Sequence, residues 1–167
     1  MALPNKVLPG FSVAMYAQSG ASPTALTTAQ LALVASVSPI AVSGNLLQVE
    51  AVPAFGQDDA VANFSAAGVR QSDKVPTQSA PTSMTITAAW NPTDSVIVQM
   101  RTDAYSGVID RTFVIAATDG ATSPNIIYYS FNGRVSQFQI DAQPGAEAKA
   151  VFTIHPRGNQ YGWSNNA

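Results

Sequence analysis

Residues 84–94 read Met-Thr-Ile-Thr-Ala-Ala-Trp-Asn-Pro-Thr-Asp, and they join a strand pattern directly to the start of a helix. Apolar side chains at alternate positions from Met84 to Trp90 share one face, while threonines occupy the other. A period of two residues with a β-branched outer face predicts a half-buried strand.

The helix start follows this strand at once. Asn91 is a capping residue type, Pro92 suits the first helical position, and Asp94 can reach back to free backbone amides. An apolar stripe follows at helical spacing, made of Val96, Ile97 and Met100. We predict that the helix ends within Asp103–Gly107, at the stop signal Ser106-Gly107. The alternative, a strand over Ser95–Met100, is weaker because of the strong cap.

Strand patterns continue downstream. Residues 111–118 alternate, with Phe113, Ile115 and Ala117 on one face, and Asp119-Gly120 predicts a turn. The next strand, 126–132, runs through Gly133 into 135–141. Since Val135 and Phe138 have opposite parity, this strand needs a β-bulge near Ser136-Gln137.

The end of the chain holds one more turn and one more strand. Gln143-Pro144-Gly145-Ala146 matches a type II turn, and residues 148–155 form the last predicted strand. Residues 156–167 are expected to be a polar C-terminal tail with one large side chain, Trp163.

The N-terminal half has weaker periodicity. Candidate strands lie at 12–17, 37–42 and 46–52, and residues 27–35 fit either a helix capped at Thr27 or Thr28 or a strand. Residues 53–82 contain few large apolar side chains. We interpret them as a long loop or β-ribbon that leaves the body of the domain.

Together these patterns predict a mainly β fold. It is a β-sandwich or barrel with one short flanking helix and a long extended loop, in a single domain spanning residues 1–167. The predicted core consists of Ile86, Trp90, Phe113, Ile115, Tyr129, Phe131, Phe138, Ile140, Phe152 and Ile154.

The composition argues against several functions. Charged residues make up 11% of the chain, against about 25% in a typical soluble domain, and such a surface suits self-assembly because neutral polar groups are cheaper to bury. The net charge of −2 and the scattered arginines give no footprint for nucleic-acid binding. The absence of cysteine excludes thiolate chemistry. We expect no membrane-spanning segment and no secretory signal.

No residue pattern supports catalysis, a cofactor or a metal ion. His155 is the single histidine, and no nucleophile or orienting carboxylate stands at a fitting spacing, so we expect a surface histidine. Asp58-Asp59 lacks the spaced oxygen ligands of a calcium loop. The chain is therefore not expected to be an enzyme.

The second half of the chain resembles the tail tube proteins of long-tailed bacteriophages. The likeness rests on the strand and helix start at 84–94, on Arg-Thr-Phe-Val-Ile-Ala-Ala-Thr-Asp-Gly at 111–120 and on the final strand Ala-Lys-Ala-Val-Phe-Thr-Ile. Its most specific element is Phe-x-Gly-x-Val-x-x-Phe-x-Ile, formed by Phe131, Gly133, Val135, Phe138 and Ile140.

This resemblance implies a structural protein of the virion tail, assembled in the host cytoplasm. It implies hexameric rings that stack into a hollow tube, contacts with other tail proteins, a lumen that conducts DNA without specific binding, and no role for a membrane. Basic side chains are then expected to face outward or to pair with carboxylates. Residues 53–82 are expected to mediate stacking between rings.

The candidate interaction residues are side chains of the long loop together with one outward-facing tyrosine: Phe55, Asp58, Asp59, Phe64, Arg70, Asp73, Lys74 and Tyr128. Two alternative functions remain open from the sequence. One is another self-assembling ring or shell protein, such as a secretion-needle ring or a capsid decoration protein. The other is a carbohydrate-binding β-sandwich, which would expose an aromatic platform.

Overall fold

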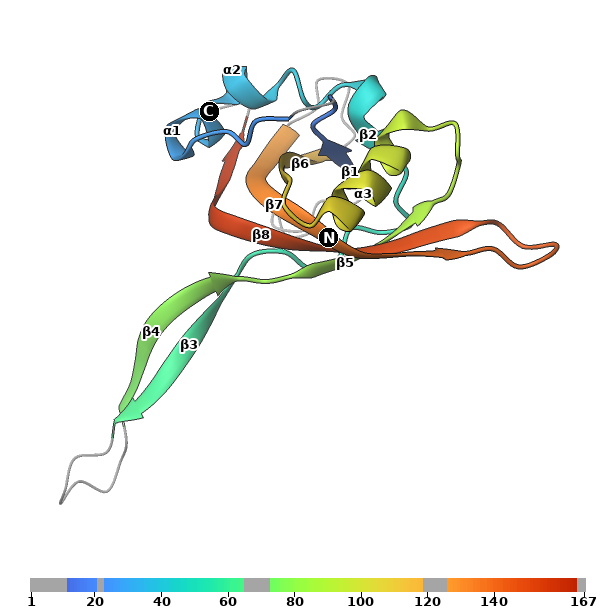
Figure 1. Ribbon diagram of the computed structural model, residues 1–167. Helices are drawn as coiled ribbons and strands as arrows, with labels where there is room; N and C mark the ends of the chain where they lie inside the picture. The colour runs from blue at the N-terminus through green and yellow to red at the C-terminus, as the bar shows by residue number, and fades with distance from the viewer. Residues whose placement is uncertain (1–11, 21–22, 65–72, 119–125, 165–167) are drawn as a thin grey trace, which may run out of the picture.

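The computed structural model describes residues 12–20, 23–64, 73–118 and 126–164, and of 57–64, 73–79 and 163–164 it describes the backbone alone. Six antiparallel strands form one sheet in the order β2-β1-β6-β7-β8-β5 (Figure 1). Their bounds are β1 Ser12–Ala17, β2 Leu46–Leu47, β5 Met84–Ala89, β6 Asp110–Thr118, β7 Ile126–Asp141 and β8 Lys149–Ser164. The predicted mainly β fold is confirmed.

The two edges of this sheet meet, so that it curls into a barrel. The chain leaving β2 forms a bridge from Val49 to Ala88 of β5. Glu50 N donates to Thr87 O and Ala89 N donates to Gln48 O, both at 2.9 Å. One short segment therefore pairs with β1 on one side and with β5 on the other, which reduces the exposed backbone at both edges.

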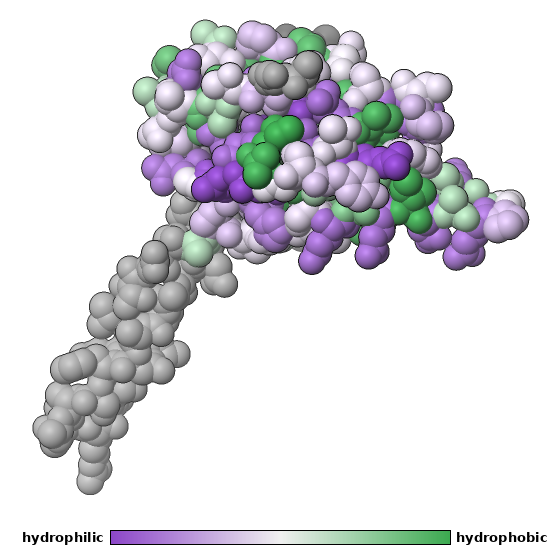
Figure 2. Space-filling view, in the orientation of Figure 1, coloured by the Kyte–Doolittle hydropathy of each residue, from purple (hydrophilic) through white to green (hydrophobic). Residues whose placement is uncertain are grey.

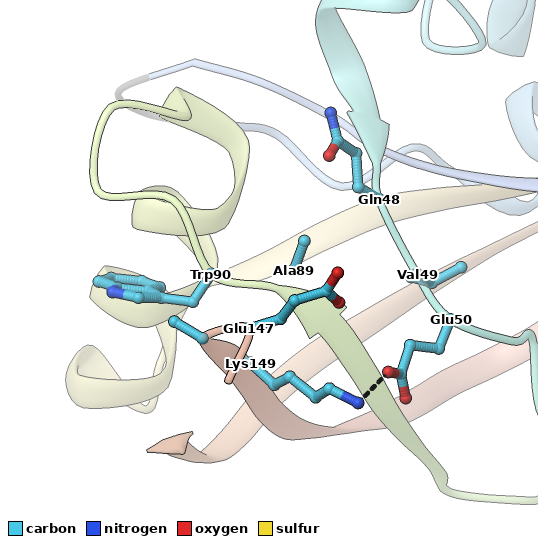
Figure 3. A pocket seen from close by; sticks show the side chains of 8 residues that line it. Gln48, Val49, Glu50, Ala89, Trp90, Glu147 and Lys149 are labelled. Atoms are coloured by element: carbon cyan, nitrogen blue, oxygen red, sulfur yellow. Dashed lines mark hydrogen bonds and ion pairs between the residues drawn. The ribbon is translucent and has the colours of Figure 1, made fainter. Parts of the chain in front are cut away.

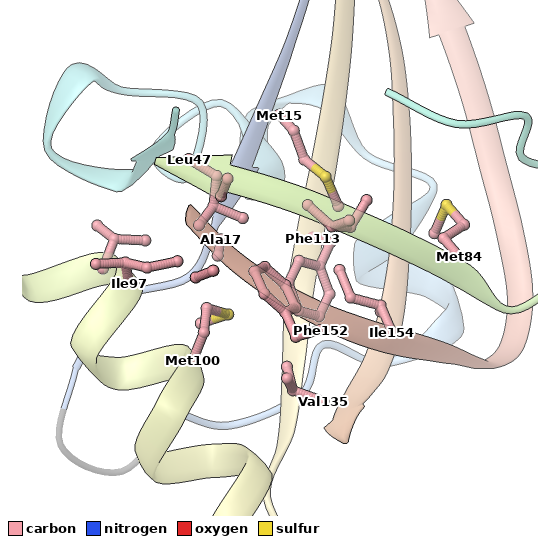
Figure 4. Close-up of a cluster of buried hydrophobic side chains, with 14 of the residues drawn as sticks. Met15, Ala17, Leu47, Met84, Ile97, Met100, Phe113, Val135, Phe152 and Ile154 are labelled. Atoms are coloured by element: carbon pink, nitrogen blue, oxygen red, sulfur yellow. The ribbon is translucent and has the colours of Figure 1, made fainter. Parts of the chain in front are cut away.

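The core lies inside the curled sheet (Figure 4). Six of the predicted core residues are buried: Ile86, Phe113, Ile115, Phe131, Phe152 and Ile154. Trp90, Tyr129 and Phe138 are partly buried against them. Ile140 is 43% exposed although it pairs with the buried Ala150, and its assignment to the core was wrong. Buried residues that the prediction omitted include Met15, Leu47, Met84, Met100 and Val135.

The predicted β-bulge is present in β7. Ser136 pairs with Thr153 and Gln139 with Val151, so that β7 carries one extra residue there. Gln137 takes up the irregularity with φ 55°, and Phe138 is thereby placed against Phe152, with ring centroids 5.7 Å apart. Val135 and Phe138, which would point to opposite faces of a regular strand, can therefore both pack in the same core.

The expected polar tail from residue 156 is instead part of β8. Between the pairs Asn132↔Arg157 and Ser130↔Tyr161 the β8 side has two extra residues, and Gly158 there has φ 70°. The prediction was wrong because backbone pairing with the free edge of β7 forms this part of the strand. Such pairing needs no apolar alternation in the sequence.

Helix α3 spans Ser95–Ser106, and its cap lies three residues later than predicted. Asp94 is the N-cap and accepts from Val96 N at 2.9 Å. Asn91 instead accepts from Thr93 N at 3.0 Å in the preceding turn. Gly107, with φ 64°, ends the helix at the predicted stop signal. The predicted stripe is buried, as Val96, Ile97 and Met100 show.

The segment before β2 contains short helices and turns, and the strand predicted at 37–42 is absent, because α2 (Val34–Val37) ends at Val37 and turns follow it. The segment also contains α1 (Thr28–Leu31) and a 3-10 turn (Ser43–Asn45). Thr27 caps α1 in a capping box with Gln30, which decides between the two alternatives left open. Val37 and Ile40 pack on Val114, so both faces of β6 are covered. The predicted strand 46–52 is reduced to β2 and the bridge at Val49.

In the described parts of the chain, no helix is both long and apolar enough to cross a membrane.

The long loop contains a two-stranded sheet, β3 (Gln57–Phe64) and β4 (Asp73–Pro81). This ribbon extends away from the barrel (Figure 1), as the β-ribbon interpretation predicted. The predicted turn at Asp119-Gly120 lies outside the described residues.

A buried ion pair joins α3 to the barrel. The Arg111 side chain on β6 donates through Nε and Nη2 to Asp103 on α3, with Nη2 at 2.9 Å from Oδ1. Both side chains are 0% exposed. Arg111 Nη1 also donates to the Gln18 carbonyl just after β1. Opposite Arg111 on β7 lies Gly133, where a Cβ would come within 2.8 Å of Ile154 Cγ2.

We predict that Asp103→Asn destabilises the subunit by about 3–5 kcal/mol, because it leaves a buried guanidinium without its counter-charge. Equilibrium denaturation of the subunit measures this. The control Asp110→Asn removes a carboxylate from a partly exposed pair and should cost less than about 1 kcal/mol. Equal losses for both variants would contradict the prediction.

Candidate assembly surfaces

The root of the β3–β4 ribbon is fixed by aromatic packing on the barrel. Thr82 N donates to Gly56 O at 3.2 Å and closes the ribbon at its base. Phe55 lies edge-on to Tyr129 of β7, with ring centroids 4.8 Å apart. The Tyr129 ring in turn lies against Gly162 of β8, where a Cβ would be 2.8 Å from Tyr129 Cε1. The ribbon therefore starts from a firm base although it extends from the barrel.

The structure distributes the predicted interaction residues along this ribbon. Phe64 pairs with Asp73 and Asn63 with Lys74 at its far end. Asp58 and Asp59 lie near its root, on β3, opposite Ala80 and Ser79. Arg70 lies outside the described residues.

Phe55 and Tyr128 serve the body of the protein as well. Phe55 is half-buried at the ribbon root. Tyr128 is half-buried against the cluster of Val37, Ile40 and Val114 on the outer side of the sheet. Their role in contacts between molecules stays a prediction.

The outer face of β5, β8 and β7 carries polar side chains. His155 is exposed there, as expected, and its two ring nitrogens lie 2.8 Å from Ser83 Oγ and from Ser136 Oγ. Thr85 and Thr153 are neighbours across β5 and β8. On the molecular face drawn in Figure 2, strongly hydrophobic residues are scattered among polar and weakly apolar ones. Because both ring nitrogens of His155 are bonded to serine hydroxyls, no carboxylate orients this imidazole as one does in a catalytic triad.

Cations near this face are paired with carboxylates. Arg134 and Arg157 share Asp110, at 2.9 and 2.8 Å. Lys149 on β8 pairs with Glu50. These contacts agree with the expectation that basic side chains pair with carboxylates.

A groove of about 490 Å³ opens where β2 meets β5 and β8 (Figure 3). Its lining consists of Gln48, Val49, Glu50, Ala89, Trp90, Glu147, Ala148 and Lys149. The hydrogen bond and the charge of Glu50 raise the pKa of Lys149, and Glu147 and Asp141 add to the effect. Among the described residues, no three metal-ligating side chains form a cluster. The charged groups of the groove are the carboxylates of Glu50 and Glu147 and the amine of Lys149. The pair with Glu50 keeps that amine protonated, and a protonated amine is a poor nucleophile.

Two residues beside the ribbon root, Gly162 and Gln160, were not predicted as structural residues. The sequence had placed both in a polar C-terminal tail. The available signal was the run of Gly158, Tyr161 and Gly162, whose glycine and aromatic residues are typical of an irregular strand.

We predict that Glu50→Gln lowers the pKa of Lys149 toward its ordinary 10.5, because the neighbouring charge is removed. In the wild type the Lys149–Glu50 pair stabilises the folded state at pH values below 10.5, the ordinary pKa of a lysine. Because the pKa of Lys149 is higher in the folded state, this contribution is lost as the pH rises through that higher pKa. An NMR titration of the Lys149 side chain measures the shift. If the pKa of Lys149 were the same in the Glu50→Gln variant, Glu50 would not be the group that raises it.

We predict that Gly162→Ala loosens the ribbon root, because the new methyl group would displace the Tyr129 ring from its contact with Phe55. Amide hydrogen exchange should become about tenfold faster at Thr82, whose N–H closes the ribbon. Gly44→Ala is the control, since a Cβ at Gly44 meets nothing within 4 Å. Unchanged exchange in Gly162→Ala would refute the anchoring role.

The sequence matches no known family model and no curated protein. The fold, however, is similar to solved structures. A chain of the anti-feeding prophage baseplate matches with a TM-score of 0.64 at 11% identity, over 98% of this chain and 97% of the other. A chain of the PVC sheath/tube terminator, from an extracellular contractile injection system, matches with a TM-score of 0.59 at 10% identity, over 96% and 97%.

The SPP1 tail tube matches with a TM-score of 0.52 at 12% identity, over 92% of this chain and 76% of the other. The resemblance to tail tube proteins found in the sequence is therefore confirmed for the fold. The chain has the fold that is shared by these components of phage tails and contractile injection systems.

Proposed function

We propose that the protein is a structural subunit of a tail tube that assembles with copies of itself. Six copies form a ring, and rings stack into a hollow tube that conducts DNA during ejection. The observation that carries this proposal is the β3–β4 ribbon, which leaves a barrel of tail-tube fold from a fixed aromatic root. The protein would act in the virion tail, together with other tail proteins, after assembly in the host cytoplasm.

The physical reason lies in the ribbon itself. A two-stranded β-ribbon is marginally stable in water when it stands alone. Each of its strands also has one edge that no further strand of the described residues pairs with, and such edges favour contact with another chain. Packing against a subunit of the next ring would supply the missing partners. We therefore assign ring-to-ring stacking to residues 53–82.

The polar outer face of β5, β8 and β7 suits a channel wall. A DNA strand passing through a tube is retained by every uncompensated cation that touches a phosphate. On this face Arg134 and Arg157 share the carboxylate of Asp110, which offsets one of their two positive charges. This partial compensation supports the placement of the face toward the lumen.

The same features argue for a non-enzymatic role. A surface with few charges suits a protein whose function is contact, since charged residues make up 11% of the chain. The carbohydrate-binding alternative needs several exposed aromatic side chains on one face. Among the side chains that the structure describes, Tyr105 is the exposed aromatic, at 73%, which leaves this alternative without a platform.

The proposal predicts that a subunit without its ribbon folds but does not form tubes. Residues 58–80 can be replaced by Asn-Gly, a two-residue turn that suits a hairpin, since Gln57 and Pro81 are paired. Phe55 and Gly56 are thereby kept. Electron microscopy of concentrated protein should show tubes for the wild type, and single subunits or isolated rings for the deletion.

Equilibrium denaturation is the control for this experiment, since the deletion should keep the barrel stability within about 1 kcal/mol of the wild type. Tubes formed by the deleted protein would contradict the stacking role. Isolated rings formed by the wild type would favour the alternative of another ring or shell protein.

A further inference from the structure

A second groove lies beside the ribbon root. It has a volume of about 430 Å³ and is lined by Phe55, Gly56, Tyr129, Gln160 and Gly162. Phe55 and Gly56 lead into β3, Tyr129 belongs to β7, and the last two residues belong to β8. The groove thus adjoins the point where the ribbon leaves the barrel.

Gln160, which lines this groove, has an unsatisfied hydrogen-bond donor. Its Nε2 atom is buried and has no hydrogen-bond partner, and among the described residues it is the one buried side-chain polar atom of this kind. Burying an amide without a partner opposes folding. Its neighbour Asn159, by contrast, donates to Tyr161 Oη at 3.1 Å within the chain.

The backbone places Gln160 there through an irregularity. Residues 158–160 lie between the pairs Asn132↔Arg157 and Ser130↔Tyr161, where β8 has its two extra residues. Gly158 turns with φ 70°. Bulges of this kind redirect a side chain out of the ordinary alternation of a strand and are common next to functional sites.

The lining of the groove limits what can bind. None of its five residues carries a charge at neutral pH, and two of them are aromatic. A carboxylate or phosphate bound here would lose water without meeting a counter-charge. A peptide carbonyl suits the site better, because it is a neutral acceptor and its chain can lie along the rings.

We propose that this groove binds an extended segment from a second copy of the chain, and that Gln160 Nε2 donates to a backbone carbonyl of that segment. The inference rests on the proposed function, which places another copy against the adjoining ribbon. Gln160 is then a residue whose hydrogen bond is completed by assembly alone. Its side chain would determine which neutral segment is accepted, because a charged segment would be excluded.

The test compares Gln160→Leu with the matched control Asn159→Ala. Leucine has a similar size and cannot donate, so an interface hydrogen bond is lost while the unsatisfied donor of the free subunit is also removed. We expect the critical concentration for tube formation, measured by light scattering and checked by electron microscopy, to rise about tenfold. Below that concentration the subunit should resist denaturant as well as the wild type or better. Asn159→Ala should leave assembly unchanged.

These two readouts separate the possible outcomes. If the Gln160→Leu variant formed tubes at the same critical concentration as the wild type, the groove assignment would be overturned and the proposed function would remain intact. A less stable Gln160→Leu subunit would also overturn it, because the amide would then have a partner within its own chain. Wild-type protein that never assembles would overturn the proposed function and, with it, a second copy as the occupant.

Discussion

The buried contact between Arg111 and Asp103 sets the arrangement of the whole barrel. A guanidinium removed from water is tolerated only where a carboxylate and further acceptors meet it in fixed positions. Asp103 supplies that carboxylate from α3, and the Gln18 carbonyl supplies an acceptor just after β1. Three elements that are distant in sequence are thereby tied to one side chain of β6. Gly133 lies opposite, where Phe113 and Ile154 leave no space for a Cβ.

The barrel and the β3–β4 ribbon are held by different contacts. The barrel buries Phe113, Phe131 and Phe152 and closes its edges through the Val49 bridge. The ribbon is joined to the barrel at its root, where Phe55 packs on Tyr129. The described core cluster consists of residues from the barrel strands and α3. In the proposed assembly, the unpaired Gln160 amide favours contact between copies.

The strands at 84–89 and 110–118 were predictable because each has a continuous apolar face with period two. The bulge in β7 was predictable as well, since Val135 and Phe138 cannot otherwise serve the same core. Helix α3 was found with the wrong cap. Asn91 and Asp94 are both good caps, and the choice depends on where the chain leaves β5. The strand expected at 37–42 failed because Val37 and Ile40 pack against Val114 from a helical segment, a contact that local periodicity does not contain.

By itself the sequence determined the strand-rich class, the helix that follows residue 94 and the long projecting segment, because these follow from local periodicity and from the residue inventory. Tertiary structure alone decided that residues 156–164 form a strand, since pairing with β7 supplies backbone hydrogen bonds whatever the side chains are. It also decided that Arg111 is buried, that Gly162 supports Tyr129 and that Gln160 is directed to a groove. These features depend on contacts between segments far apart in the chain, and no local pattern encodes them.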